Sequence, residues 1–133
     1  MAREAFQTLS EPMYYVLLSL TEERYGAQIM EQVKALSHGR IAVGPGTLYM
    51  MLSRFLEWGF ITETAVFGRR KSYLITKAGE DMLREEYRRL QQLLEDGKMV
   101  LQQLGQGLPT PAEIGERSGM LNEKEISAAA QSV

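Results

Sequence analysis

The chain of 133 residues is long enough for one compact domain, or for a domain with an extension, and its apolar fraction of 44% can supply a core. It contains no cysteine and only one histidine, His38, which excludes disulfides and thiolate or histidine zinc sites and removes the usual general base of an enzyme. No apolar run is long enough to span a membrane, and no signal-peptide pattern opens the chain. We therefore expect a cytoplasmic protein with no catalytic activity, no cofactor and no metal site.

The first predicted helix begins at Ser10-Glu11-Pro12. Ser10 can cap the helix with its hydroxyl oxygen, and a proline fits the first turn. Residues 1–9 before it carry no strong pattern and are expected to form a short N-terminal arm. Apolar side chains continue around most of the helix surface, which is typical of a helix packed between partners. These side chains are Met13, Tyr14, Tyr15, Val16, Leu17, Leu18 and Leu20.

A second helix is predicted from Tyr25-Gly26 to about Ser37, after a short polar break at residues 21–24. A link through residues 38–43 then leads to a third helix. Helix, short link, helix, link and helix is the layout of a helix-turn-helix unit. The residues expected on the buried side of the second helix are Ile29, Met30, Val33 and Leu36.

The third predicted helix has a signal at each end. Pro45 suits its first turn because the φ angle of proline is already near the helical value, and Gly59 supplies a left-handed stop. A stripe of apolar residues at three- and four-residue steps is expected to face the core. That stripe comprises Leu48, Met51, Leu52, Phe55 and Leu56, and the opposite face comprises Thr47, Tyr49, Met50, Ser53 and Arg54.

The net charge is −2, yet the basic residues concentrate in two segments that contain no acid. One lies between Gln32 and Leu56, and the other between Thr64 and Gly79. A helix held by its apolar back, with a front free of acids, has the shape that enters the major groove of DNA. The alternative is an ordinary amphipathic core helix with a solvated face. The cations of the two segments are Lys34, Arg40, Arg54, Arg69, Arg70, Lys71 and Lys77.

A β-hairpin is predicted directly after the third helix. Phe60–Phe67 is rich in β-branched and aromatic residues, Gly68–Lys71 predicts a turn with three cations, and Ser72–Ile75 predicts the returning strand. Two strands around a basic tip form a wing, whose cations are suited to contact phosphates. The alternative is a solubilising turn whose charges lie in water.

A long helix is predicted from the N-cap Thr76 to Leu104. Its apolar residues recur at alternating spacings of four and three residues, which forms a heptad seam. A helix of about 29 residues would reach roughly 40 Å, beyond a domain this small, so pairing with a second copy explains the seam better. The tail, residues 105–133, is expected to be loosely held, with a capped helix start at Thr110. The seam residues are Leu83, Tyr87, Leu90, Leu94, Gly97, Leu101 and Leu104.

Two strings in this chain are fairly specific: Gly44-Pro45-Gly46-Thr47-Leu48-Tyr49, and Arg69-Arg70-Lys71 followed by Tyr73 and Ile75-Thr76. With them, residues 10–104 resemble the PadR family of bacterial transcriptional repressors. The resemblance implies a mainly α fold with a small β-hairpin, namely a winged helix-turn-helix domain at residues 1–75 and a dimerisation helix at residues 76–104. It also implies a homodimer that binds near-palindromic double-stranded operator DNA and is released by a small aromatic or amphipathic ligand in or near the dimer interface.

The charge pattern and the resemblance together predict one set of DNA-contacting residues, drawn from the second helix, the third helix and the wing. The set comprises Lys34, Arg40, Thr47, Tyr49, Ser53, Arg54, Arg69, Arg70, Lys71 and Tyr73.

Two other functions stay open beside the repressor. One is a ligand-binding sensor, with or without strong DNA binding, and the other is a protein-interaction module on the same scaffold. A sensor and a repressor are compatible, because a bound ligand could re-space the two recognition helices. The residues expected to line an aromatic ligand, unless they are plain core and interface residues, are Tyr14, Tyr15, Trp58, Met82 and Tyr87.

Overall fold

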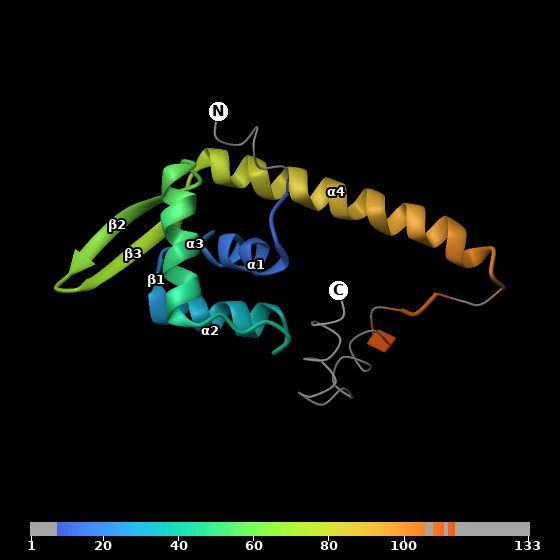
Figure 1. Ribbon diagram of the computed structural model, residues 1–133, viewed down its shortest axis with the longest axis horizontal. Helices are drawn as coiled ribbons and strands as arrows, with labels where there is room; N and C mark the ends of the chain where they lie inside the picture. Colours follow the sequence, from blue (N-terminus) through green and yellow to red (C-terminus); the bar gives the residue numbers. More distant parts are fainter. Residues whose placement is uncertain (1–7, 106–107, 111, 114–133) are drawn as a thin grey trace. The chain divides into compact units, whose positions relative to one another are not determined.

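The computed structural model describes residues 8–105, 108–110 and 112–113. The chain divides into two compact units, residues 1–91 and 92–133. None of the helices in the described ranges is long and apolar enough to cross a membrane. The elements, coloured in chain order in Figure 1, are α1 (Glu11–Ser19), β1 (Arg24–Tyr25), α2 (Gly26–Leu36), α3 (Pro45–Glu57), β2 (Ile61–Phe67), β3 (Arg70–Ile75) and α4 (Lys77–Gln102).

The helix ends follow the capping signals of the sequence. The Ser10 hydroxyl accepts a hydrogen bond from the Met13 N–H at 3.3 Å, so α1 begins where its cap predicts. Pro45 occupies the first turn of α3, and Gly59 follows that helix with a φ of +76°, in the left-handed region that favours glycine. The predicted starts and ends of the first three helices are therefore confirmed to within a residue or two.

The sheet has three antiparallel strands in the order β1-β3-β2, one strand more than the sequence predicts. The additional strand, β1, has only two residues, and Tyr25 of β1 pairs with Ser72 of β3. The predicted four-residue turn is also wrong in length, because Arg70 and Lys71 belong to β3 and only Gly68 and Arg69 form the turn. We call β2, this turn and β3 the wing.

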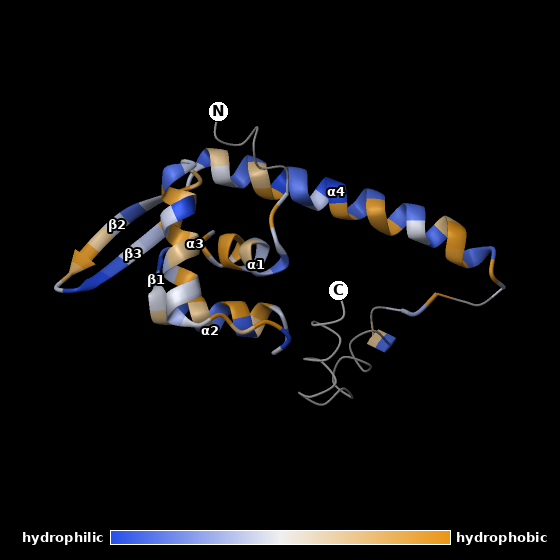
Figure 2. Cartoon of the chain, in the orientation of Figure 1, coloured by the Kyte–Doolittle hydropathy of each residue, from blue (hydrophilic) through white to orange (hydrophobic). Residues whose placement is uncertain are grey.

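The core of the first unit lies between α1, α2 and α3. Figure 2 shows apolar residues along α1, of which Met13, Val16, Leu17 and Leu20 are buried and Tyr14, Tyr15 and Leu18 are half-buried. The stripe of α3 is buried as predicted, except that Leu56 is half-buried. On α2 the prediction for Leu36 is wrong: this residue is 38% exposed, at the last position of the helix. Met30 of the same set is half-buried.

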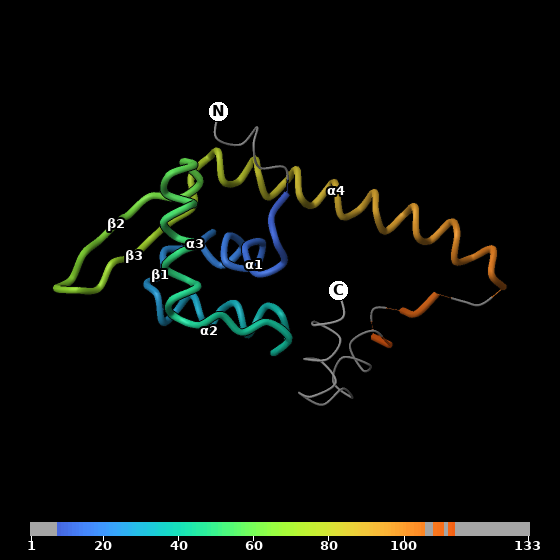
Figure 3. The backbone as a smooth tube through the Cα atoms, in the orientation of Figure 1, coloured from blue at the N-terminus to red at the C-terminus, as the bar shows by residue number. Residues whose placement is uncertain are grey.

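The end of α3 is joined to the start of α4 by a compact set of hydrogen bonds. Figure 3 follows the backbone from α3 out along the wing and back to this junction. There the Thr76 N–H donates to the Phe60 carbonyl at 2.9 Å, and the Thr76 hydroxyl donates to the Gly59 carbonyl at 2.6 Å. The same hydroxyl oxygen accepts from the Gly79 N–H at 3.2 Å, so Thr76 is the predicted N-cap. The junction sets the position of the wing on the helix before it.

Two predicted segments lie mostly outside the described residues. Residues 1–7 of the predicted N-terminal arm are outside, while Leu9 is buried in the core. Within the predicted tail, Thr110 and Glu113 exchange two hydrogen bonds in the manner of a capping box, which agrees with the predicted helix start. Residues 106–107, 111 and 114–133 of the tail lie outside the described ranges.

Candidate nucleic-acid interface

The exposed face of α3 is the first part of the candidate interface. Its predicted DNA-contacting residues are all exposed, because the helix buries the opposite stripe. Tyr49 and Ser53 are one turn apart and therefore share one side of this face. Thr47 and Arg54 lie two turns apart on the neighbouring side. Arg54 forms no ion pair or side-chain hydrogen bond with any residue that the structure describes.

A groove of about 310 Å³ lies between α3 and the wing, and we call it the α3–wing groove. It places Tyr49 and Ser53 of the helix beside Arg69 and Lys71 of the wing. The fold thus brings together side chains that are distant in the sequence and that carry hydrogen-bonding groups and positive charge. The residues lining the groove are Tyr49, Leu52, Ser53, Leu56, Glu63, Arg69, Lys71 and Tyr73.

The cations of the wing do not form a single cluster. Arg69 and Lys71 line the α3–wing groove, whereas the guanidinium of Arg70 lies over the ring of Tyr25, 4.1 Å from its centroid. The separation follows from the strand, since successive residues of β3 point to opposite faces of the sheet. Arg70 therefore fastens the wing to β1 by a cation–π contact, and Arg69 and Lys71 face the helix side.

The groove contains one acid, Glu63, and one buried tyrosine, Tyr73. The Glu63 carboxylate lies 3.6 Å from the ammonium of Lys71, and Glu63 is paired across the strands with Tyr73. Burial raises the pKa of the Tyr73 phenol, and the charges of Glu63 and Tyr49 raise it further. Tyr73 is only 4% exposed and belongs to the core. The sequence pattern missed Glu63, whose position depends on the strand register around a bulge between Glu63 and Ala65.

Arg40 lies outside the α3–wing groove. Its guanidinium donates to the Tyr15 hydroxyl at 2.7 Å and to the Ser37 carbonyl at 2.9 Å. The Ser37 hydroxyl in turn accepts from the Ile41 N–H at 3.0 Å. Arg40 therefore connects the link between α2 and α3 to α1, and its donors are partly occupied inside the protein.

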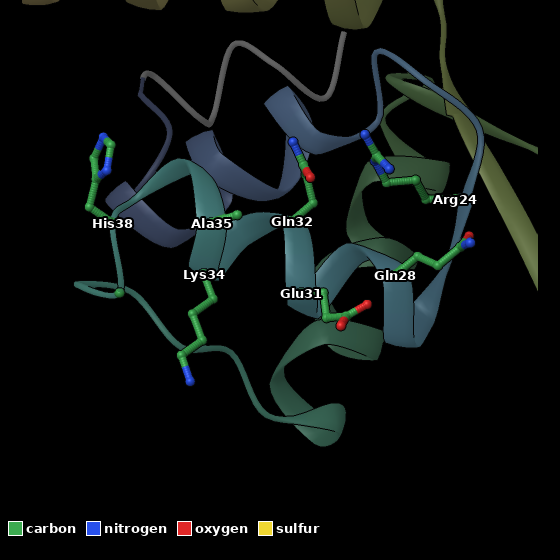
Figure 4. A pocket seen from close by; sticks show the side chains of 8 residues that line it. Arg24, Gln28, Glu31, Gln32, Lys34, Ala35 and His38 are labelled. Atoms are coloured by element: carbon green, nitrogen blue, oxygen red, sulfur yellow. The ribbon is translucent and has the colours of Figure 1, made fainter.

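Lys34 lies on the outer face of α2, beside an open depression of about 850 Å³. In Figure 4 the Lys34 side chain points away from those of Gln32 and His38, so the polar groups there do not converge on one point. The described part of the chain also holds no cluster of three or more His, Asp or Glu side chains that could bind a metal ion. No residue that lines this depression, Lys34 included, lines the α3–wing groove.

The predicted seam on α4 is buried at its start and exposed beyond it. Leu83 is 9% exposed and packs in the core of the first unit, and the remaining large apolar residues of the seam are exposed. Gly97 has no atom within 4 Å of the position that a Cβ would take. The exposed apolar residues of α4 are Tyr87, Leu90, Leu94 and Leu101 of the seam, together with Leu93, Met99 and Val100 outside it.

The residues predicted to line an aromatic ligand are only partly together. Tyr14 and Tyr87 line a cavity of about 430 Å³ between α1 and α4, which also presents Arg84 and Arg88. Burial raises the pKa of the Tyr14 phenol, and the charges of Tyr15, Glu86 and Tyr87 add to this effect.

The other three predicted residues do not line this cavity. Tyr15 packs edge-on against Tyr14, with 6.1 Å between ring centroids, and Met82 is fully buried. Trp58 packs against Phe60, with 5.9 Å between ring centroids, and against Phe55. Trp58 thus belongs to an aromatic group at the end of α3.

Comparison with known proteins gives a family match and several similar solved structures. The family model described as the transcriptional regulator PadR-like family matches residues 16–85, from α1 into α4. No curated protein gives a significant match.

Several solved structures are similar to this chain. A PadR-like transcription factor from Bacteroides fragilis is 27% identical, with 67% of this chain and 87% of that chain covered and a TM-score of 0.55. A PadR family transcriptional regulator from Eggerthella lenta is 26% identical, with 75% and 80% covered and a TM-score of 0.54. A PadR family transcription regulator from Clostridium difficile is 23% identical, with 65% and 97% covered and a TM-score of 0.53, and this likeness concerns the fold.

Proposed function

The chain belongs to the PadR-like family of transcriptional regulators, and on that premise we propose that it is a cytoplasmic, dimeric, DNA-binding repressor without catalytic activity. The observation that carries the proposal is the α3–wing groove, in which the exposed side of a helix meets two cations of the wing. A helix that enters the major groove of DNA brings such flanking cations close to the phosphates.

Base recognition would depend on few side chains. Arg54 is the single cation of α3, and a bidentate contact from arginine to guanine is worth about 1–3 kcal/mol of discrimination. Thr47 and Ser53 offer hydroxyls, and Tyr49 offers a phenol, all of which can bond to phosphates as well as to bases. We therefore propose that Arg54 carries most of the direct readout and that the other three mainly set the position of α3.

Phosphate contacts are assigned to Arg69 and Lys71. Arg69 forms no ion pair with the residues that the structure describes, and the exposed ion pair between Lys71 and Glu63 is weak enough to be exchanged for a phosphate. Arg70 and Tyr73 would position the wing, since one is held over Tyr25 and the other is buried. We leave Lys34 out of the contact set because it lies on the outer face of α2, and Arg40 because its guanidinium is engaged by Tyr15 and Ser37.

Dimerisation is proposed along the exposed seam of α4. Two copies related by a two-fold axis would present two α3 helices to successive major grooves, and the operator would be near-palindromic. The exposed leucines of the seam support this pairing, because a row of large apolar side chains in water favours a partner of the same kind.

Selection of bound sequences from a randomised duplex library tests the proposal. The full chain should enrich a near-palindromic site, and the Arg54→Ala variant should lose preference at one position of each half-site. Failure to enrich any duplex would reject the repressor and favour the protein-interaction module.

The salt dependence of binding to the selected duplex tests the wing assignment. The slope of log K against log salt is negative. In the Arg69→Ala/Lys71→Ala variant it should become less steep by about 0.9 for each phosphate that the wing no longer neutralises. Arg70→Ala removes the same kind of charge from the other face of the sheet and should change the slope less. Equal slopes for all three proteins would remove the wing from the interface.

A second function is supported by the cavity between α1 and α4. We propose that it binds a small aromatic or amphipathic effector that releases the repressor from DNA. Its volume of about 430 Å³ is within the range of small-molecule sites, and Tyr14 and Tyr87 offer aromatic surfaces. Arg88 forms no ion pair with the described residues, so a carboxylate on the effector would find a cation there.

Calorimetric titration with benzoate and with uncharged benzamide tests the effector site. Benzoate should bind the full chain more tightly than benzamide, and Arg88→Ala should remove the difference. Trp58→Phe serves as the matched control, because Trp58 does not line the cavity. If Trp58→Phe abolishes binding and Arg88→Ala preserves it, the effector site lies elsewhere.

A further inference from the structure

Met50 is an exposed apolar side chain in the middle of the polar face of α3. The residue is 51% exposed, whereas its neighbour Met51 belongs to the core at 7%. Residues three and four positions apart are neighbours on a helix surface, so Met50 lies between Thr47, one turn before it, and Arg54, one turn after it. An apolar group thus stands between two side chains that the proposed interface directs toward DNA.

Packing within the described part of the chain does not explain this side chain. Met50 lines neither the α3–wing groove nor the cavity between α1 and α4. The buried stripe of α3 is already filled by Leu48, Met51, Leu52 and Phe55. Methionine is also a good helix former, but a role in helix propensity alone would leave the DNA sequence preference unchanged. Propensity and DNA contact are therefore separable by experiment.

The major groove of DNA offers one apolar partner for such a side chain. Each base pair presents hydrogen-bonding groups there, and thymine adds its C5-methyl group. The methionine side chain donates no hydrogen bond and its sulfur is a weak acceptor, so it is poorly suited to read the polar edges of bases. It is flexible and polarisable, which suits it to pack against an irregular apolar surface. Chemistry thus pairs Met50 with the thymine methyl group.

We propose that Met50 is a specificity-determining residue that packs against the C5-methyl group of one thymine in each half-site. This inference rests on the proposed DNA-binding function and deepens it, because it adds an apolar reader to Arg54, which reads by hydrogen bonds. An α-helix rises about 1.5 Å per residue, so Met50 and Arg54 are about 6 Å apart along the helix axis. Base pairs stack about 3.4 Å apart, so the thymine lies within about two base pairs of the position that Arg54 reads.

Replacement of thymine by uracil in the duplex selected by the full chain tests the proposal, because uracil lacks only the C5-methyl group. Each thymine near the position at which Arg54→Ala loses preference is replaced in turn, in both half-sites. At one of them the full chain should bind the uracil duplex about fourfold more weakly per half-site, as expected when the burial of one methyl group is lost. Met50→Ala removes the side chain beyond Cβ, so this variant should bind the thymine and uracil duplexes alike.

The matched control is Met99→Ala. Met99 is a methionine of α4 that is 64% exposed and lies outside the seam, so its substitution should preserve the weaker binding to uracil. The substitution in the protein and the replacement in the DNA together form a double-mutant cycle, whose coupling measures the contact between Met50 and the methyl group. Substitution of so exposed a side chain should not unfold the protein, and equal melting temperatures check this.

Two results would overturn the thymine contact while leaving the repressor intact. One is a selected half-site that has no thymine in the expected range of the Arg54 position. The other is a uracil effect that is absent in the full chain, or that persists unchanged in Met50→Ala. If the full chain selects no duplex at all, the proposed DNA-binding function fails and the thymine contact fails with it.

Discussion

Because of the buried phenol of Tyr73, we expect this protein to lose stability at alkaline pH. Burial, Glu63 and Tyr49 raise the pKa of Tyr73 in the folded state, so the protonated phenol is favoured there. A raised folded pKa gives stability that is fully present below the unfolded pKa of about 10 and is lost as the pH rises through the folded pKa. Urea unfolding midpoints should therefore fall as the pH is raised beyond about 10.

The Tyr73→Phe variant should show a shallower fall in this alkaline window. The remaining part belongs to Tyr14, whose pKa is also raised by burial. Tyr49→Phe removes only the last of the three causes that raise the pKa of Tyr73, so its alkaline fall should lie between those of the original chain and Tyr73→Phe. An alkaline fall of the same depth in Tyr73→Phe would show that the protonated Tyr73 phenol does not stabilise the fold.

Gly26 sets the position of Tyr49, a residue of the proposed DNA interface. A Cβ at Gly26 would lie 2.7 Å from the Tyr49 hydroxyl oxygen, so Gly26→Ala should displace the tyrosine side chain. We expect DNA affinity to fall by several-fold with little change in stability, because the displaced group is the exposed end of a flexible side chain.

A double-mutant cycle isolates the cause. Tyr49→Phe removes the atom that would clash, so Gly26→Ala/Tyr49→Phe should bind the selected duplex as Tyr49→Phe alone does. Additive losses in the double variant would mean that Gly26 acts on DNA binding by another route.

Local signals explain why the helices could be predicted and the third strand could not. Ser10, Pro45 and Gly59 act through their own backbone geometry, which is visible in the sequence. Arg24 and Tyr25 form a strand only because β3 lies beside them, and two residues carry no period of their own. The position of Arg70 over Tyr25 follows from that strand and could not be predicted either.

The candidate site likewise contains residues whose position could be predicted from the sequence and residues whose position could not. The exposure of Tyr49, Ser53 and Arg54 follows from helical periodicity and could be predicted. The burial of Tyr73 and the presence of Glu63 in the α3–wing groove depend on strand register, which a bulge shifts by one residue. The exposed residues of α3 were therefore predictable one by one, whereas the residues of the wing that line the groove required the fold.

The junction between α3 and α4 depends on the absence of a side chain at Gly79. A Cβ there would meet the Phe60 carbonyl oxygen and would lie 2.6 Å from a side-chain carbon of Ile75. Helix propensity alone would make Gly79→Ala stabilising by up to ~1 kcal/mol. Because backbone atoms cannot easily move aside, we expect Gly79→Ala to lower the free energy of unfolding by ~1–3 kcal/mol instead.

Gly46→Ala is the matched control for that substitution. Gly46 is also a helical glycine near an N-terminus, and no atom lies within 4 Å of its Cβ position. Thermal unfolding of both variants should give a lower melting temperature for Gly79→Ala and no loss for Gly46→Ala. A melting temperature for Gly79→Ala equal to that of the original chain would mean that α4 can shift away from Phe60.

At the scale of the whole molecule, cations and acids gather on different surfaces. A net charge of −2 coexists with the cations of the α3–wing groove, and many acids lie on α4, including Glu80 and Asp81, which pair with Arg84. An acidic remainder discourages DNA from binding by the wrong face, and the local cations retain attraction on the proposed one. Because the overall charge is weak, DNA affinity should depend on how many wings contact the duplex. That number is set by the number of subunits.

The proposed dimer gives the last prediction. Leu94 and Leu101 lie two turns apart on the exposed seam, and lysine at both places would put charge into an apolar interface. Sedimentation equilibrium should find the original chain dimeric and Leu94→Lys/Leu101→Lys monomeric. The same variant should bind the selected duplex much more weakly, because each half-site would then be bound by a separate molecule rather than by a linked pair.

The control adds the same charge away from the seam. Gln92 and Gln102 are exposed on α4 outside the heptad positions, and Gln92→Lys/Gln102→Lys should remain dimeric. If both double variants sediment as dimers, the subunits pair through another surface. If the original chain is itself a monomer at the concentration where it binds its duplex, the two-fold arrangement of α3 helices has no basis and the operator need not be palindromic.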